Sequence, residues 1–166
     1  MSSTSTYEVK FKRRLKGKTN YRKRLAFLKS GMPRAVIRRS NNSIQVQVIN
    51  YGKNGDVTLA SASSGELRKL GWKHHGGNLS AAYLTGMLCG TRAKGNGIAR
   101  AIVDIGMISP VHGSGIFAAA KGIADSGIEL PLDASAVPSE DRIKGKHLKD
   151  GAPAEFEKII QEIRKK

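Results

Sequence analysis

Residues 34–63 decide the fold, and they read RAVIRRSNNSIQVQVINYGKNGDVTLASAS. In the middle of this stretch, apolar Ile44, Val46 and Val48 alternate strictly with glutamines. Alternation with a period of two is typical of a strand with one buried face. The runs 34–40 and 57–63 are also strand-like, and residues typical of turns separate the three runs. The stretch therefore predicts an antiparallel meander of three strands.

The pattern changes to helical spacing further along the chain. We expect a helix over residues 80–94, capped by Asn78 or Ser80, and a second helix that begins after Ser114 and ends at Gly127. The nearly all-apolar run 99–105 predicts a strand covered on both faces, and a short strand is expected at 128–130. Strand–helix–strand crossovers require parallel pairing. The expected fold class is therefore α/β, with a mixed sheet covered by helices.

The segments outside this body are shorter. Residues 1–9 are rich in Ser and Thr, residues 10–18 predict an extended arm, and a helix is expected over 21–29 between a cap at Thr19 or Asn20 and a stop at Gly31. Residues 66–70 predict a helical turn and 138–151 a polar loop, and a last helix begins at Pro153. This organisation predicts an arm and short helix over 1–31, an α/β domain over 32–131, and a loop and helix over 132–166.

The charge is concentrated at the start of the chain. Residues 1–39 hold 13 Lys or Arg and one acid, Glu8, which gives +12 of the +16 carried by all 166 residues. A functionless surface usually mixes both signs, and such an excess opposes folding unless a counter-charge is present. The aromatic residues Tyr7, Phe11 and Tyr21 lie among the cations and could stack on bases. We therefore expect a polyanionic partner, with nucleic acid favoured over a membrane surface.

Several other classes of protein fit the sequence poorly. The single cysteine, Cys89, allows no internal disulfide and is expected in the core. No apolar run approaches the roughly 18–20 residues of a membrane span, and the first ten residues lack an apolar signal core. His74-His75 reads as a surface loop, so we expect no metal and no cofactor. Asp104 reads as a buried acid bonded to the backbone or paired with Arg100, although a catalytic role stays open.

Five sequence blocks, in order, resemble a known family. They are GKTNYRKRLAFLKSGMPRAVIRRSNNSIQVQ (17–47), TLASASSGELRKLGW (58–72), GNLSAAYLTGMLCGTRA (77–93), VDIGMISPVHGSGIFAAAKGIADSGIELP (103–131) and RIKGKHL (142–148). The chain resembles the large-subunit ribosomal proteins that bind 5S ribosomal RNA, in their archaeal form. The resemblance implies a three-layer α/β fold of the RNase H-like, translational-machinery type, and a structural rather than an enzymatic role.

The resemblance also implies partners and a binding site. The partners would be 5S rRNA, large-subunit rRNA in the central protuberance and neighbouring ribosomal proteins, in the cytoplasmic large subunit, with no membrane and no homo-oligomer. The residues expected to contact RNA are Lys10, Lys12, Arg13, Arg14, Lys16, Lys18, Tyr21, Arg22, Arg24, Arg34, Arg38, Arg39, Ser40, Asn41, Asn42, His112 and Ser114.

Two alternatives stay open from the residues alone. The first is a metal-dependent nuclease on an RNase H-like sheet, using Asp104, Asp56 or Asp125. The second is a basic protein that binds and compacts DNA without sequence preference. Duplex DNA and A-form RNA differ in groove shape and in the 2′-hydroxyl, so competition between them would separate the second alternative from RNA binding.

Overall fold

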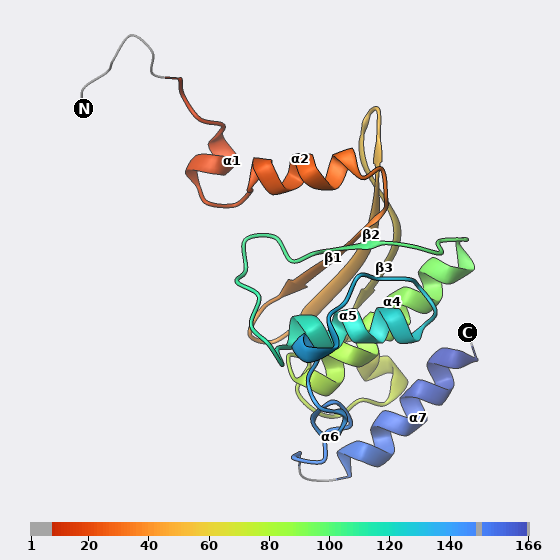
Figure 1. The fold of residues 1–166 in the computed structure, drawn as a ribbon. Helices are drawn as coiled ribbons and strands as arrows, with labels where there is room; N and C mark the ends of the chain where they lie inside the picture. The colour runs from red at the N-terminus through yellow and green to blue at the C-terminus, as the bar shows by residue number, and fades with distance from the viewer. Residues whose placement is uncertain (1–7, 149–150, 166) are drawn as a thin grey trace.

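The chain folds in three layers in a computed structural model that describes residues 8–148 and 151–165. One four-stranded sheet forms the first layer, and helices α4 (Leu79–Gly95) and α5 (Gly115–Asp125) cover one of its faces (Figure 1). Helices α6 (Glu140–Ile143) and α7 (Ala152–Arg164) pack on the outer side of α4. The predicted three-layer α/β fold is confirmed. No helix within the described residues is long and apolar enough to cross a membrane.

The sheet has the strand order β3-β2-β1-β4. Strands β1 (Arg34–Arg39), β2 (Ile44–Gly52) and β3 (Gly55–Ser63) pair antiparallel, as the alternation predicts. Ile44, Val46 and Val48 are at most 1% exposed and face α4, whereas the glutamines between them point to the other side. The sheet therefore has one apolar face beneath helices and one polar face, which we call the free face.

The last strand is shorter than the sequence predicts. Strand β4 (Ile102–Asp104) pairs parallel with β1 at the edge of the sheet and is only partly buried. It stops because the amide of Gly106 donates to the Asp104 carboxylate at 2.8 Å and Gly106 adopts a φ of 69°, which bends the chain away. The strand expected at 128–130 is reduced to one parallel bridge between Arg100 and Glu129.

Helices α4 and α5 cross at very short range. Asn78 caps α4 by accepting from the Ala81 amide at 2.7 Å. Gly86 and Gly90 lie on the side of α4 that faces α5, where a Cβ would collide with Ala119 and Ser126. The absence of side chains at these two positions therefore allows the close approach of α4 to α5.

The N-terminal segment lies at the end of the molecule opposite α6 and α7 (Figure 1). Helix α2 (Tyr21–Lys29) agrees with the prediction, and Asn20 caps it by accepting from the amides of Arg22 and Lys23. The expected extended arm is partly wrong, since Lys12–Leu15 forms a single helical turn, α1. Its residues KRRL all favour helix, and Gly17 ends the turn with a φ of 62°.

The remaining elements are short. Helix α3 (Ser64–Leu67) and the 3₁₀ turn η1 (Arg68–Leu70) form the predicted helical turn, and η2 (Ala134–Ala136) follows β4 and α5. The expected polar loop 138–151 is partly wrong because it contains α6, and residues 149–150 of that loop lie outside the described part of the chain. In α7, Phe156, Ile159 and Ile163 pack into the core, as the apolar stripe predicts.

Candidate nucleic-acid interface

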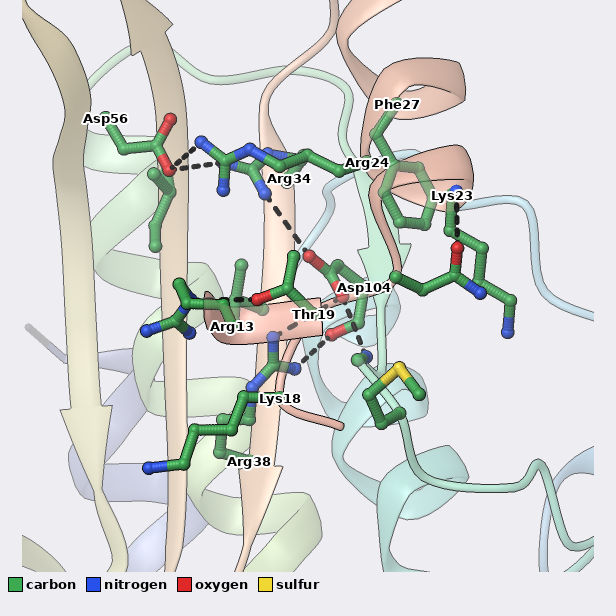
Figure 2. Close-up of a pocket in the computed structure, with 15 residues that line it drawn as sticks. Arg13, Lys18, Thr19, Lys23, Arg24, Phe27, Arg34, Arg38, Asp56 and Asp104 are labelled. Atoms are coloured by element: carbon green, nitrogen blue, oxygen red, sulfur yellow. Dashed lines mark hydrogen bonds and ion pairs between the residues drawn. The ribbon is translucent and has the colours of Figure 1, made fainter. Parts of the chain in front are cut away.

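A groove separates the N-terminal segment from the free face of the sheet. Its walls come from the basic arm (residues 10–18), from α2, from β1 and from the loop after β4, and Figure 2 shows the side chains that line it. Arg13 is held in this groove because its Nε donates to the hydroxyl of Thr19 at 2.9 Å. Segments that are far apart in sequence therefore meet in one basic site.

Three arginines and two aspartates form a continuous chain of ion pairs in the groove. Asp56 Oδ2 accepts from Arg24 Nη2 at 3.0 Å and from Arg34 Nη2 at 2.9 Å (Figure 2). The other Nη of Arg34 reaches Asp104 at 3.3 Å, and Arg38 Nη2 lies 3.5 Å from the same carboxylate. The chain runs from α2 across β3 and β1 to β4, so it ties the N-terminal helix to the sheet.

The two partners of Asp56 change its protonation equilibrium. Partial burial by itself would raise the pKa of Asp56. Hydrogen bonds and positive charge from Arg34 and Arg24 together outweigh burial, so the pKa lies below its ordinary value. The carboxylate therefore stays ionised well into the acid range.

Arg34 differs from the other predicted RNA contacts because it is buried. Only 5% of the residue is exposed, and two carboxylates occupy its guanidinium. A phosphate could reach it only if the ion-pair chain opened, so we leave Arg34 out of the candidate interface. Arg24 and Arg38 are partly exposed, with 38% and 46% of their side chains accessible, although each has a carboxylate partner.

Most of the early positive charge is free of carboxylate partners. Of the 13 cations before residue 40, three are paired as above, and the other ten form no ion pair with an acid in residues 8–148 or 151–165. All ten are exposed, and they are Lys10, Lys12, Arg13, Arg14, Lys16, Lys18, Arg22, Lys23, Lys29 and Arg39. Nothing in the described body neutralises them, which leaves a strongly positive surface.

The expected stacking aromatics have different surroundings. Phe11 is 70% exposed, and its ring centroid lies 5.1 Å from that of the half-buried Tyr21. The pair joins the arm to the first turn of α2. Tyr7 lies outside the described residues. Phe11 is therefore the more accessible ring of the pair.

The turn between β1 and β2 forms a second part of the candidate interface. Ser40 and Ser43 close the turn with three mutual hydrogen bonds of 2.9–3.1 Å in which Ser40 Oγ takes part. Arg39, Ser40 and Asn41 share a hollow with Ser114 and the loop before α5. Gly76 and Gly77 lie directly beneath the backbone of Asn41 and Asn42, where side chains would not fit. The turn is therefore held rigidly.

His112 and Ser114 flank this hollow. His112 is exposed, with its ring 6.3 Å from that of Phe117. Ser114 is the residue before α5, and its hydroxyl is buried without a hydrogen-bond partner among the described residues. Met107, from the same long loop, reaches back to line the groove beside α2. The loop after β4 thus connects the two parts of the interface.

Comparison with known proteins identifies the family. The sequence model of the ribosomal large-subunit proteins 60S L5 and 50S L18 matches residues 5–97, more than half of the 166 residues. The chain belongs to this family. The "large ribosomal subunit protein uL18" of Korarchaeum cryptofilum is 50% identical over 148 residues, covering 89% of this chain and 76% of that protein. The protein of the same name from Methanothermobacter thermautotrophicus is 43% identical over 166 residues, covering 100% of this chain and 85% of its own length.

Membership of the 60S L5 and 50S L18 family confirms the resemblance on which the sequence analysis relied. It makes the chain an archaeal-type protein of the large ribosomal subunit, so its partners are ribosomal RNA and ribosomal proteins.

The three carboxylates of the nuclease alternative do not form one site. Asp56 and Asp104 lie in the same groove, but the guanidinium of Arg34 bridges them, and Asp125 lies apart on α5, where it accepts from the Tyr83 hydroxyl at 2.9 Å. No group of three or more His, Cys, Asp or Glu with the geometry of a metal site occurs in the described ranges. Asp104 is buried and accepts from the backbone amide of Gly106 at 2.8 Å, which is one of the two expected arrangements. The other, a pair with Arg100, was wrong because Arg100 pairs with Glu129 at 2.6 Å.

Sequence reasoning missed the role of Asp56 and of the loop around Met107. Asp56 is the only acid in the stretch 34–63, near the start of β3, and the arginines of this stretch lie two strands away on β1. An isolated acid within a basic region was the available signal. Met107 and Ile108 gave a weaker signal, because they are apolar residues in an expected loop. The structure shows that both are exposed.

Proposed function

We propose that this ribosomal protein binds 5S rRNA and helps attach it to large-subunit rRNA in the central protuberance, without catalytic activity, in cytoplasmic ribosomes. The observation that carries the proposal is the group of ten exposed cations without carboxylate partners in the described chain. The resemblance of residues 17–47 to the RNA-contacting segment of 5S-binding proteins supports the choice of RNA.

The residues divide into roles. The basic arm and α2 supply phosphate contacts, through Lys10, Lys12, Arg13, Arg14, Lys16, Lys18, Arg22 and, where its ion pair allows, Arg24. Tyr21, beside Phe11, supplies an aromatic ring on which a base can stack. The rigid turn and the neighbouring loop contribute Arg38, Arg39, Ser40, Asn41, Asn42, His112 and Ser114. Residues 32–131 serve as the scaffold, and residues 132–166 extend it.

The combination of an exposed basic arm and a turn closed by its own hydrogen bonds suits a folded RNA. Guanidinium groups contact two phosphate oxygens at once, and side chains fixed on a turn select a particular spacing of phosphates. A-form RNA presents its 2′-hydroxyls and phosphates across a shallow minor groove, which small polar side chains such as Ser40 and Asn41 can contact. Loose electrostatic attraction alone would not need the turn.

The test is the salt dependence of binding by the full chain. If about seven phosphates are neutralised, log affinity for a 5S rRNA transcript should fall with log salt at a slope of roughly −5 to −6. A duplex DNA of matched length is the control and should bind more weakly at every salt concentration. A flat salt dependence, or equal affinity for the DNA, would contradict the proposal. Chemical footprints with and without residues 1–20 would then locate the part of the RNA that the arm covers.

A further inference from the structure

Helix α2 is held over the sheet by polar contacts rather than by a core. None of its residues is buried, and Phe27 and Leu28 are only half-buried. It joins β1 through a short link in which Gly31 adopts a φ of 66° and Pro33 leads into the strand. Within the described residues, the pair Arg24–Asp56 is the one ion pair between α2 and the sheet.

Contacts within the sheet hold Asp56 in place, so it offers α2 a fixed ion-pair partner. The same oxygen that accepts from Arg24 at 3.0 Å accepts from the buried Arg34 at 2.9 Å. Arg34 is anchored to Asp104 in β4, so the carboxylate cannot follow a movement of α2. Arg22 and Lys23, adjacent to Arg24, are exposed and have no carboxylate partner in the described chain.

We propose that Asp56 is a positioning residue for RNA binding: it docks α2 on the sheet, so that Arg22 and Lys23 are held beside the basic arm before RNA arrives. This inference rests on the proposed function. The docked helix presents its cations in one arrangement, and the apparent affinity for RNA equals the affinity of that arrangement multiplied by the fraction of molecules that adopt it.

Removal of Asp56 should change the affinity for RNA in the direction opposite to the one that charge alone predicts. Asp56 is an acid inside a basic surface, so charge alone predicts that its removal strengthens binding to a polyanion. Docking predicts the reverse. If Asp56→Asn lowers the docked fraction of α2 to about one tenth, affinity for RNA should fall roughly tenfold. The salt slope should stay the same, because the complex that forms still contains the docked helix with Arg22 and Lys23 in place.

The matched control is Glu129→Gln. It removes the same unit of negative charge from an ion pair, Arg100–Glu129, that lies outside the interface and is 68–69% exposed. Affinity for the 5S rRNA transcript should stay equal to that of the original chain or rise slightly. Far-UV circular dichroism and urea unfolding of both variants show whether Asp56→Asn keeps its fold.

A second variant keeps the inference testable if Asp56→Asn fails to fold. Arg24→Gln removes the tether but leaves Arg34 paired with both aspartates, and Arg22→Gln removes the same charge without touching an ion pair. Hydrogen exchange of the α2 amides in the free protein should be about tenfold faster in Arg24→Gln and unchanged in Arg22→Gln. Amides in β1–β3 should keep their protection in both variants.

The outcomes separate the two proposals. If the original chain shows no salt-dependent binding of 5S rRNA, the proposed function fails. If it binds and a folded Asp56→Asn binds equally well or more tightly, the positioning role is overturned and the acid acts only through its charge. Unchanged exchange of α2 in Arg24→Gln would also overturn it, because the ion pair would then not hold the helix.

Discussion

Gly122 of α5 lies directly against the carbonyl oxygen of Tyr83 in α4, with no space for a side chain between the two backbones. Gly86 makes the reciprocal approach from α4 to Ala119. The close packing of the two helices that support the sheet therefore depends on glycine, whose side chain is a single hydrogen atom, at a few positions.

The first prediction concerns this contact. Gly122→Ala should lower the free energy of unfolding by about 1–3 kcal/mol or more, because the added methyl group meets backbone atoms that cannot rotate away. Gly95→Ala is the control, since a Cβ at Gly95 meets nothing within 4 Å. Urea unfolding should show the control unchanged or slightly more stable. Equal stabilities of the two variants would contradict the close crossing.

The second prediction separates two arginines that the sequence treats alike. Arg34→Gln should cost about 3–5 kcal/mol of stability, because Asp56 and Asp104 lose a buried partner. Arg39→Gln should change stability by less than about 0.5 kcal/mol and should lower the salt slope of 5S rRNA binding by about 0.9. Urea unfolding and filter binding measure the two effects. Comparable losses of stability in both variants would show that burial does not distinguish them.

The third prediction follows from the lowered pKa of Asp56. A carboxylate whose pKa is lower in the folded than in the unfolded chain contributes stability above its unfolded value, near 3.8, and loses that contribution as the pH falls through the folded value. The stability difference between the original chain and Asp56→Asn should therefore be constant near neutral pH and should shrink below about pH 4. Urea unfolding across this range measures it. A difference that grows on acidification would contradict the assigned direction.

The fourth prediction concerns the outer edge of the sheet. Arg92 donates to the Ser61 carbonyl at 2.5 Å, and Asn96 donates to the Leu59 carbonyl at 2.7 Å. Both acceptors belong to β3, so a side chain of α4 and that of Asn96, the residue after the helix, cover an edge that is otherwise open to another strand. The double variant Arg92→Ala, Asn96→Ala should lose about 1–3 kcal/mol and aggregate faster on heating. Light scattering should show no such change for Lys158→Ala, which removes an exposed cation from α7.

The sheet and most helix ends were predictable because their signals are local. The alternation at residues 44–48 specified which face of β2 is buried, and Asn20 and Asn78 marked the first turns of α2 and α4. Each of these features depends on residues within one or two turns of each other. Pattern and capping rules describe such short distances well.

The features that escaped prediction depend on partners distant in sequence. Arg34 looked like a surface cation, and its burial depends on Asp104, which is 70 residues away. The two-residue alternation of a strand cannot show that α2 lies over part of the free face of the sheet. The glycines of α4 indicated that another backbone packs closely against the helix, but only the crossover topology decides that this neighbour is α5.

Gly76 and Gly77 seat the turn at Asn41–Asn42 on the segment that leads into α4. A side chain at residue 77 would meet the carbonyl of Asn41 and displace the turn that carries Arg39 and Ser40. A substitution in the approach to α4 would therefore alter the candidate interface from a position that is distant in sequence.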